Sequence, residues 1–523
     1  MTIATAPDRA SRQVSARHAT QPVPLHAPCP APVLPRNPTI YAINALTWLR
    51  ELRRRFDARL SLGTIPRSVW DELARWGVDA VWLRGVWTRS PAGVGLALED
   101  TELTAGFRRT LPDFADADVV GSSSCVRAYE ADDRLGGRAG LVVAREALAE
   151  RGIGLILDFV ANHVGPDHAW VASNPSYFIR GEPCELARSP ADFLPAGGGV
   201  VARARGPYAA PWPDVVQLNV FDAGLRSAAT DVLRDIAAQC DGVRCDGATL
   251  VLNDVFAQTW GSRPGAPPLT EYWADVIAGV KASYPRFLFI GKADWDREWD
   301  LQQLGFDYCY DERMYDRLAH DRADAVRAHL NAERVYQQRL ARFIEDGGPP
   351  AAAAFGPARH RAVVVAAATQ MGARIFHDGQ CVGRRRRCSD FLIRRADESS
   401  DPALTAFYRR LLGALRLEPL RSGDWRLCEC TGWAGNGSCE NLVAWRWRGR
   451  RGWALVAVNL SGTPAQARVR IDGIDALGGR EWVLRDLLSG ARYRRDGDEM
   501  RDVGLYVDLP AWGYHLLVTD GAG

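Results

Sequence analysis

Short apolar runs alternate with longer amphipathic stretches along the chain from Ile40 onward. The stretches between the runs, such as those at 140–152 and 226–240, place apolar residues at helical spacing and end near Gly or Asp. This alternation predicts a parallel β-sheet with helical crossovers, either doubly wound or closed into a (β/α)₈ barrel. The runs that we expect to be strands are VDAVWL (78–83), GLILDFV (154–160), GVRCDG (242–247), FLFIGK (287–292), ARFIED (341–346) and ARIFHD (373–378).

Three segments depart from this alternation. Residues 1–37 are polar and then rich in Pro, which interrupts regular hydrogen bonding, so we expect a disordered tail. The segment at about 165–225 is rich in Pro, Gly and aromatic residues, and it predicts a subdomain inserted on a loop after the third strand. Short alternating strands over 415–523 predict a separate all-β domain, which leaves 38–414 for the barrel.

The composition narrows the class of protein. A chain of 523 residues with 47% hydrophobic residues is a globular protein with more than one domain, and 11 scattered Cys predict reduced thiols. The 65 basic and 63 acidic residues nearly cancel at +2, which favours neither nucleic acid nor an anionic membrane as a partner. The sequence has no apolar run near the roughly 18 residues of a membrane span and no signal-peptide core, so we expect a cytoplasmic protein.

Polar residues gather where two predicted strands end. The strand at 154–160, which we count as the third of the barrel, has Asp158, Asn162 and His163 at or just after its end, where a barrel opens into its loops. Arg244 and Asp246, at the end of the fourth strand, are two residues apart and therefore share one face, with the guanidinium beside the carboxylate. Such a pairing keeps an Asp ionised, as a carboxylate nucleophile requires. Either group alone indicates a structural contact, but their occurrence on consecutive strands indicates an active-site cleft.

These motifs resemble the alpha-amylase superfamily, glycoside hydrolase family 13. The resemblance is carried by DFVANH (158–163), GVRCD (242–246), the stretch at 295–318 and the ending LPAWGYHLL (509–517), in the family's order. It covers most of the chain. It implies a (β/α)₈ TIM barrel with an inserted B subdomain and a C-terminal β-sandwich. It also implies retaining chemistry on α-glucosidic bonds, in which one carboxylate attacks the anomeric carbon and a second protonates the leaving oxygen.

Part of the family's site is present. By resemblance, Asp246 matches the nucleophile and Arg244 the arginine that orients it. Asp158 and His163 match the first motif, whose His binds the sugar. Asn162 matches a position that ligates calcium in some members, so the family requires no cofactor but allows calcium.

Other positions depart from the family. The fifth strand should end in the glutamate that acts as acid and base, but FLFIGKADW (287–295) has Lys292 there. The seventh should end in Asn-His-Asp, but the chain has Asp346, Gly347 and Gly348, so the transition-state Asp is lost at Gly348. Ser124 stands where the family usually has a tyrosine that stacks on the sugar.

The departures predict weak or no activity. A lysine beside Asp246 stays protonated, and we expect it to hold Asp246 in an ion pair. Losing acid/base assistance alone costs about 10² to 10⁴ in rate. Asp294 and Glu298 follow the lost acid and are the candidates for a displaced one.

The sequence thus leaves three functions open. The first is a degenerate family member that binds an α-glucan, a maltooligosaccharide or a small α-glucoside. The second is an active α-glucosidase, sucrose-splitting enzyme or trehalose synthase with a displaced acid. The third is a non-catalytic sugar- or partner-binding protein. Trp433 and Trp447 are further candidates for a glycan platform, although aromatic residues in a β-sandwich more often belong to its core.

Overall fold

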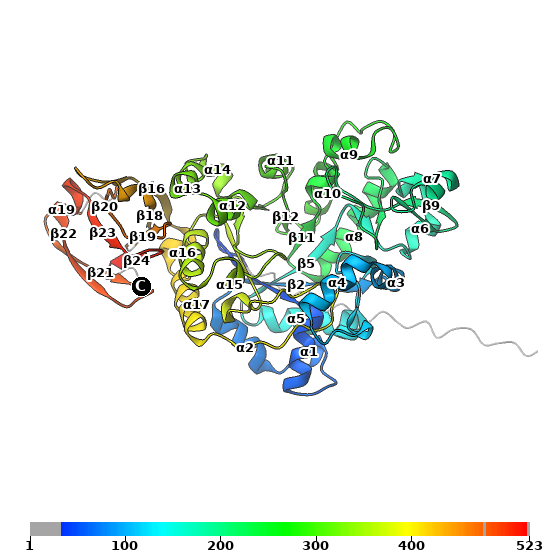
Figure 1. The fold of residues 1–523 in the computed structure, drawn as a ribbon, viewed down its shortest axis with the longest axis horizontal. Helices are drawn as coiled ribbons and strands as arrows, with labels where there is room; N and C mark the ends of the chain where they lie inside the picture. The colour runs from blue at the N-terminus through cyan, green and yellow to red at the C-terminus, as the bar shows by residue number, and fades with distance from the viewer. Residues whose placement is uncertain (1–32, 451, 474–476, 520–523) are drawn as a thin grey trace, which may run out of the picture.

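Eight parallel strands close into a barrel at the centre of the computed structural model, which describes residues 33–450, 452–473 and 477–519 (Figure 1). Each strand lies beside the next barrel strand along the chain, and the first pairs with the last. The predicted (β/α)₈ barrel is therefore confirmed. Its strands are β1 (Thr39–Asn44), β2 (Ala80–Arg84), β5 (Gly154–Val160), β11 (Gly242–Asp246), β12 (Leu288–Gly291), β13 (Tyr308–Tyr310), β14 (Leu340–Arg342) and β15 (Ala373–His377).

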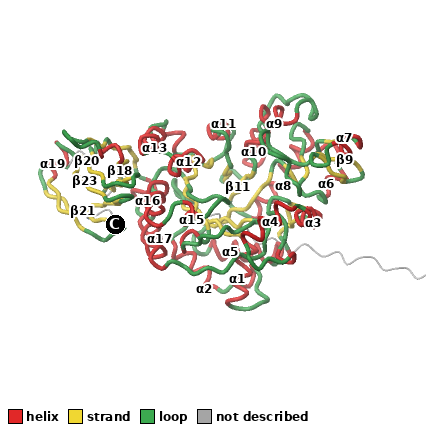
Figure 2. Tube along the Cα trace, viewed as in Figure 1, coloured by secondary structure: helices red, strands yellow, loops and turns green. Residues whose placement is uncertain are grey.

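Amphipathic helices surround the barrel (Figure 2). In α8, for example, the Asp222 side chain accepts a hydrogen bond from the backbone N–H of Leu225, and Leu225, Leu233 and Ile236 are buried at helical spacing. The helix therefore begins at a cap and packs one face on the sheet. The main surrounding helices are α1 (Ala45–Arg55), α2 (Arg67–Trp76), α5 (Gly137–Ala149), α8 (Ala223–Gln239), α10 (Tyr272–Lys281), α12 (Glu312–His320), α16 (Pro357–Ala368) and α17 (Pro402–Leu415).

The strand ends differ from the sequence prediction in one place that matters for the site. The run at 341–346 was expected to be a strand throughout, but β14 ends at Arg342. Arg342 is fully buried and contacts the Asp311 carboxylate, and the chain then leaves the sheet. Glu345 and Asp346 consequently lie in the loop above the barrel, where their side chains are free to reach neighbouring strand ends.

The segment between β5 and β11 forms a small unit of its own. It contains a three-stranded sheet in the order β7-β9-β8 and a two-stranded sheet of β10 and β6. In Figure 1, this unit lies at the opposite end of the molecule from the C-terminal domain. Its elements are β6 (His163–Val164), α6 (Ala169–Ser173), β7 (Arg180–Gly181), α7 (Pro183–Arg188), β8 (Phe193–Ala196), β9 (Gly199–Ala202) and β10 (Val216–Gln217).

The C-terminal domain consists of two antiparallel sheets, in the orders β16-β18-β19-β24-β21-β22 and β17-β20-β23. The expected all-β sandwich is confirmed, although the run at 504–518 forms two strands with a turn between them. The predicted boundary at 414 to 415 falls at the end of α17. The strands are β16 (Asp424–Cys428), β17 (Cys430–Thr431), β18 (Leu442–Arg448), β19 (Trp453–Asn459), β20 (Ala465–Val469), β21 (Glu481–Asp486), β22 (Arg492–Asp496), β23 (Leu505–Leu509) and β24 (Tyr514–Thr519).

Two tryptophans connect this domain to the barrel. The indole N–H groups of Trp445 and Trp447 both donate to the carbonyl of Thr369, just after α16, at 3.1 and 2.8 Å. Trp447 is buried, so it is a core residue and cannot form a glycan platform. Trp433 is 45% exposed.

The N-terminal prediction is only partly within the described residues. The expected disorder of residues 1–32 lies outside them. Asn37, which was assigned to the tail, is buried, and its amide donates to the carbonyls of Leu420 and Arg421. The folded part therefore begins before Thr39. In the described part of the chain, no helix is long and apolar enough to cross a membrane.

Candidate functional site

The predicted pair at the end of β11 is present. Alternation along the strand places Arg244 and Asp246 on one face, and the guanidinium Nη1 contacts Oδ1 of the carboxylate. Arg244 is itself fixed between the rings of Trp82 and Tyr310, each 5.3 Å from its Cζ. The other carboxylate oxygen, Oδ2, accepts a hydrogen bond from the Ser124 hydroxyl at 3.2 Å.

These contacts keep Asp246 ionised. Burial by itself raises the pKa of this carboxyl, but the charges of Arg244 and Lys292 outweigh burial and bring the pKa below its usual value. An ionised carboxylate at the C-terminal edge of a barrel strand is the form that can attack an anomeric carbon. The Ser124 hydroxyl thus fixes the second oxygen of the Asp246 carboxylate.

Lys292 lies directly beside this carboxylate. Cys245 of β11 is in register with Gly291 of β12, so the residues that follow them, Asp246 and Lys292, end neighbouring strands. Within the described residues, however, the ion pair of Lys292 is with Asp346, whose Oδ2 is 3.5 Å from Nζ. The expectation that Lys292 would pair with Asp246 is therefore wrong, because the loop after β14 brings a second carboxylate closer.

The ammonium remains charged in this setting. Burial lowers the pKa of Lys292, but the carboxylates of Asp346, Asp246 and Asp294 outweigh burial and raise it. Burial likewise raises the pKa of Asp346, and Lys292 and Arg244 outweigh it so that this pKa is lowered. Both partners are thus ionised at neutral pH, and neither holds a proton that it could exchange readily with a leaving group.

Asp346 had no role assigned to it from the sequence, which only placed it at the end of the seventh strand before Gly347 and Gly348. Its contact with Lys292 in the folded chain makes it a site residue. At both glycines, the position that a Cβ would occupy has no atom within 4 Å, so the space beside Asp346 is open.

Asp158 and His163 lie under the same edge of the barrel. Asp158 Oδ1 accepts from the Trp82 indole at 2.8 Å and Oδ2 from the backbone N–H of Gly85 at 2.6 Å. Burial raises the pKa of Asp158. Burial lowers the pKa of His163 to about 4, so its ring is neutral, 5.2 Å from the ring of Trp212. Asp158 thus orients the end of β2, whereas His163 is a neutral hydrogen-bonding group.

Asn162 does not form a calcium site with its neighbours. Its Oδ1 accepts from Nε2 of Gln217 at 2.9 Å, and its Nδ2 donates to Oε1 of the same side chain at 3.3 Å. The described residues contain no group of three or more His, Cys, Asp or Glu that could hold a metal ion. Because the amide oxygen is already paired and no carboxylates converge on it, the residues present do not fit calcium.

The two candidates for a displaced acid lie in different surroundings. Glu298 is buried in the first turn of α11 (Glu298–Gln303), where Asp296, Arg313 and His329 are the charges that act on it. Asp294 is half-buried, and its pKa is raised by burial and, among the nearby charges, by Asp246. Only Asp294 therefore belongs to the centre.

Glu312 is a further carboxyl near this centre that sequence reasoning missed. It begins α12, directly after the sixth barrel strand. Burial, followed by the charges of Asp346 and Asp294, raises its pKa to about 7, although Lys292 opposes the shift. A carboxyl with such a pKa is partly protonated near neutral pH. The signal that could have found it is the pair of acidic residues, Asp311 and Glu312, directly after the sixth barrel strand.

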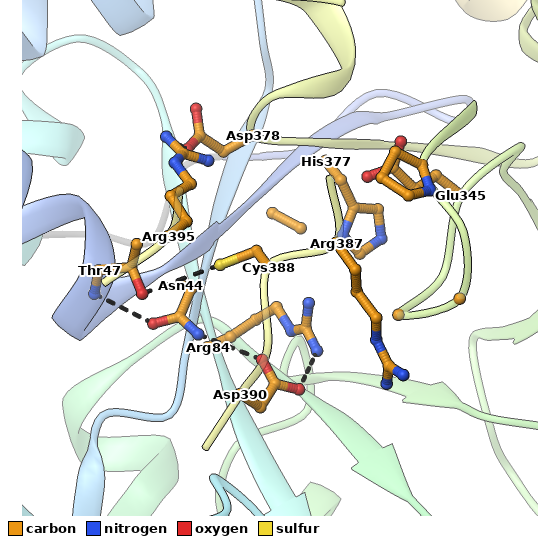
Figure 3. A pocket seen from close by; sticks show the side chains of 14 residues that line it. Asn44, Thr47, Arg84, Glu345, His377, Asp378, Arg387, Cys388, Asp390 and Arg395 are labelled. Atoms are coloured by element: carbon orange, nitrogen blue, oxygen red, sulfur yellow. Dashed lines mark hydrogen bonds and ion pairs between the residues drawn. The ribbon is translucent and has the colours of Figure 1, made fainter. Parts of the chain in front are cut away.

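A small polar pocket lies next to Gly347 and Gly348 (Figure 3). Its volume is about 40 Å³, which holds a few water molecules but no sugar ring. The loop after β15 closes one side: Asp390 pairs with Arg84 at 2.7 Å. The His377 ring lines the pocket, and its buried Nε2 has no partner among the described residues. The pocket therefore offers hydrogen-bonding groups at the edge of the cleft.

Two exposed aromatic rings lie beside each other, one in the inserted segment and one after β12. Tyr208 of the inserted segment and Trp295 after β12 are 72% and 45% exposed, with ring centroids 5.4 Å apart in an edge-to-face arrangement. Trp295 and Asp296 have φ angles of 55° and 62°, in the left-handed region that bulky residues avoid. Such backbone conformations are retained mainly where a ring or a polar group must be held in a particular place.

Comparisons with known proteins agree on the fold. No family model and no curated protein sequence matches the chain. A noncanonic maltogenic alpha-amylase from Thermotoga neapolitana is similar at 16% identity and a TM-score of 0.66, over 92% of this chain and 98% of its own. An alpha-amylase from Geobacillus thermoleovorans, solved with acarbose, is similar at 15% identity and a TM-score of 0.62, over 93% and 99%.

A debranching enzyme from Nostoc punctiforme is similar at 15% identity and a TM-score of 0.62, over 92% of this chain and 99% of its own. The similarity therefore covers the barrel, the inserted unit and the C-terminal sandwich together, and not the barrel alone. The chain has the fold of the alpha-amylases of glycoside hydrolase family 13.

Proposed function

We propose that this protein descends from retaining glycosidases or transglycosidases of the alpha-amylase family and binds an α-glucan, a maltooligosaccharide or a small α-glucoside, with weak or no hydrolysis. The similar structures are named as alpha-amylases and a debranching enzyme, and two were solved with acarbose or after an acarbose soak, which supports a carbohydrate ligand. The cytoplasmic location stays a prediction from the sequence.

One observation carries the proposal: Lys292, which the resemblance puts at the acid position, pairs with Asp346 beside the ionised Asp246. Retaining hydrolysis needs a proton for the leaving oxygen and a carboxylate for the anomeric carbon. The centre keeps the carboxylate but has a charged ammonium where the proton donor should be. Gly348 has no side chain, so the centre also lacks the carboxylate that would contact sugar hydroxyls in the transition state.

The same groups support sugar binding. The neutral ring of His163, the guanidinium of Arg244 and the ammonium of Lys292 are hydrogen-bond donors that suit hydroxyl groups. Trp295 and Tyr208 supply rings at the rim. Binding therefore requires only groups that are present, whereas turnover requires one that is absent.

A second candidate is an active enzyme with a displaced acid. The pKa of Glu312, raised to about 7, favours it, because a carboxyl with such a pKa can donate a proton near neutral pH; burial also raises the pKa of Asp294. Fructose and other good leaving groups need less acid assistance, so sucrose is the natural substrate to try.

Product release from maltooligosaccharides, sucrose and aryl α-glucosides separates these candidates. We expect binding of at least one sugar by calorimetry, and no turnover that depends on Asp246. Turnover that disappears in Asp246→Asn and in Asp294→Asn would establish the displaced acid. A folded protein that binds none of these sugars would contradict both candidates.

A further inference from the structure

A cleft of the C-terminal domain lies apart from the barrel site. It has a volume of about 600 Å³ and runs between β22 and β23, the outer strands of the two sheets. The turn between β23 and β24 and the helix α16 form its other walls. Pockets that bind small molecules have volumes of about 300 to 1,000 Å³. The cleft is therefore large enough for several sugar units.

The walls combine apolar and aromatic surface. Leu505 and Leu517, on opposite sheets, belong to the domain core and reach the cleft from within. Above this floor lie the rings of Tyr493, Tyr506, Trp512 and Tyr514. Flat rings with polar edges bind ligands that have both apolar C–H faces and hydroxyl groups.

Fixed polar groups complete the lining. His515 Nδ1 and Asp486 Oδ2 are 2.9 Å apart, and Asp486 also accepts from the Ser489 hydroxyl at 2.9 Å. Asp508 accepts from the Gln466 amide at 3.1 Å. These side chains are held by bonds to their neighbours before any ligand arrives, so little conformational entropy is lost when they bind one.

The charges of the lining balance. The acidic side chains that face the cleft are Asp486 and Asp508, and the arginines are Arg361 and Arg495. A lining with equal acidic and guanidinium groups favours neither an anionic nor a cationic ligand. A neutral molecule with many hydroxyl groups suits it best.

The backbone of the turn supplies an independent observation. Trp512 has a φ of 55°, and the described residues contain only two other non-glycine residues with positive φ, Trp295 and Asp296. Both of these follow β12, near the barrel site. Such backbone conformations cluster at ligand-binding and active sites, and here the turn holds Trp512 in the lining of the intersheet cleft.

We propose that this intersheet cleft is a second binding site, which takes a neutral oligosaccharide of the same α-glucan class as the barrel site. The ligand class rests on the function proposed above. A peptide strand added along the free edge of β23 is the competing occupant, but it would not require the balanced charges or the ring of Trp512.

The two strained tryptophans provide a matched pair of variants. Glycine adopts positive φ readily, so Trp512→Gly and Trp295→Gly each remove a ring without forcing the backbone to change. Maltoheptaose is titrated into the full chain and into both variants by calorimetry, with thermal melts to verify folding. We expect two sites in the wild type, with Trp512→Gly weakening one by roughly 10-fold and Trp295→Gly weakening only the other.

Identical isotherms for wild type and Trp512→Gly would overturn the cleft proposal, including the case in which a peptide is the occupant. Weaker maltoheptaose binding by Trp512→Gly, together with unchanged binding by Trp295→Gly, would instead overturn the barrel site and support the intersheet cleft. If Trp512→Gly fails to fold, Arg495→Ala is the second variant, since this half-buried arginine lies on an outer strand. It should weaken the same site, and unchanged binding there would overturn the proposal.

Discussion

The end of the fourth barrel strand differs in its contacts from the ends of the fifth and seventh strands. At the fourth, Arg244 and Asp246 form an ion pair that is fixed by two rings and a hydroxyl. At the fifth and seventh, Lys292 and Asp346 form a second pair, and two glycines leave open space. Under the function proposed above, the fourth strand supplies the nucleophile, and the fifth and seventh strands form the degenerate side of the centre.

Restoring the degenerate side should have the largest effect. The triple variant Lys292→Glu, Gly347→His, Gly348→Asp should gain roughly 10³-fold in maltotriose hydrolysis over the wild type, because it returns a proton donor and a transition-state carboxylate. The cleft has room for the added side chains. Gly347 has a φ of 65°, which disfavours His, so the double variant with Gly347 retained is the matched control.

Lys292→Glu alone should gain less than the double variant, since Gly348 still lacks a carboxylate. Rates are measured by reducing-sugar release. A folded triple variant as inactive as the wild type would show that the cleft has diverged beyond these three side chains.

Removing the guanidinium of Arg244 at the end of the fourth strand should destabilise the fold. Arg244→Met leaves Asp246 without its guanidinium, and we expect a loss of about 3 kcal/mol in the free energy of unfolding. The variant Arg244→Met with Asp246→Asn should recover part of this loss, because it removes the unpaired charge. Urea unfolding measures both, and equal losses in the single and double variants would contradict the ion-pair account.

The free energy of unfolding should also depend on pH through Glu345, in the loop after the seventh strand. Burial, followed by the charge of Asp378, raises the pKa of Glu345 from 4.5 to about 7. Between these values the folded protein holds a proton that the unfolded chain has released, so stability falls as pH rises through this window. Glu345→Gln, whose carbonyl can still accept from the N–H of Ala351, should remove this part of the slope. Parallel pH profiles for wild type and variant would contradict the shift.

The ion pair between Lys292 and Asp346 should contribute least to the free energy of unfolding. Lys292 is partly exposed and its distance to Asp346 is 3.5 Å, so a double-mutant cycle of Lys292→Met and Asp346→Asn should give a coupling of about 1 kcal/mol. The coupling of Lys292→Met with Asp246→Asn should be smaller. The reverse order would restore the original expectation that Lys292 pairs with Asp246.

The barrel could be predicted because its signals are local. GLILDFV is β5 from the first residue to the last, and Arg244 and Asp246 share a face because the strand period is two. The position of Asp346 could not be predicted, because it depends on where β14 ends and how the following loop turns. The raised pKa of Glu312 arises from burial and from the charges of Asp346 and Asp294 on two other segments, none of which a sequence pattern records.

The C-terminal domain shows the same limit. Alternation predicted its strands, but it did not distinguish Trp447, which packs against Thr369, from a ring on a ligand surface. Trp512 could not be singled out at all, since its φ of 55° is a property of the folded turn.

The central claim is that the nucleophile position is intact and the proton donor is missing. α-Glucosyl fluoride tests it most directly, since fluoride departs without protonation whereas the glucose of maltotriose does not. We predict that wild type releases fluoride faster than Asp246→Asn, while both leave maltotriose equally unhydrolysed. Faster maltotriose hydrolysis by the wild type, or fluoride release that does not depend on Asp246, would contradict the claim.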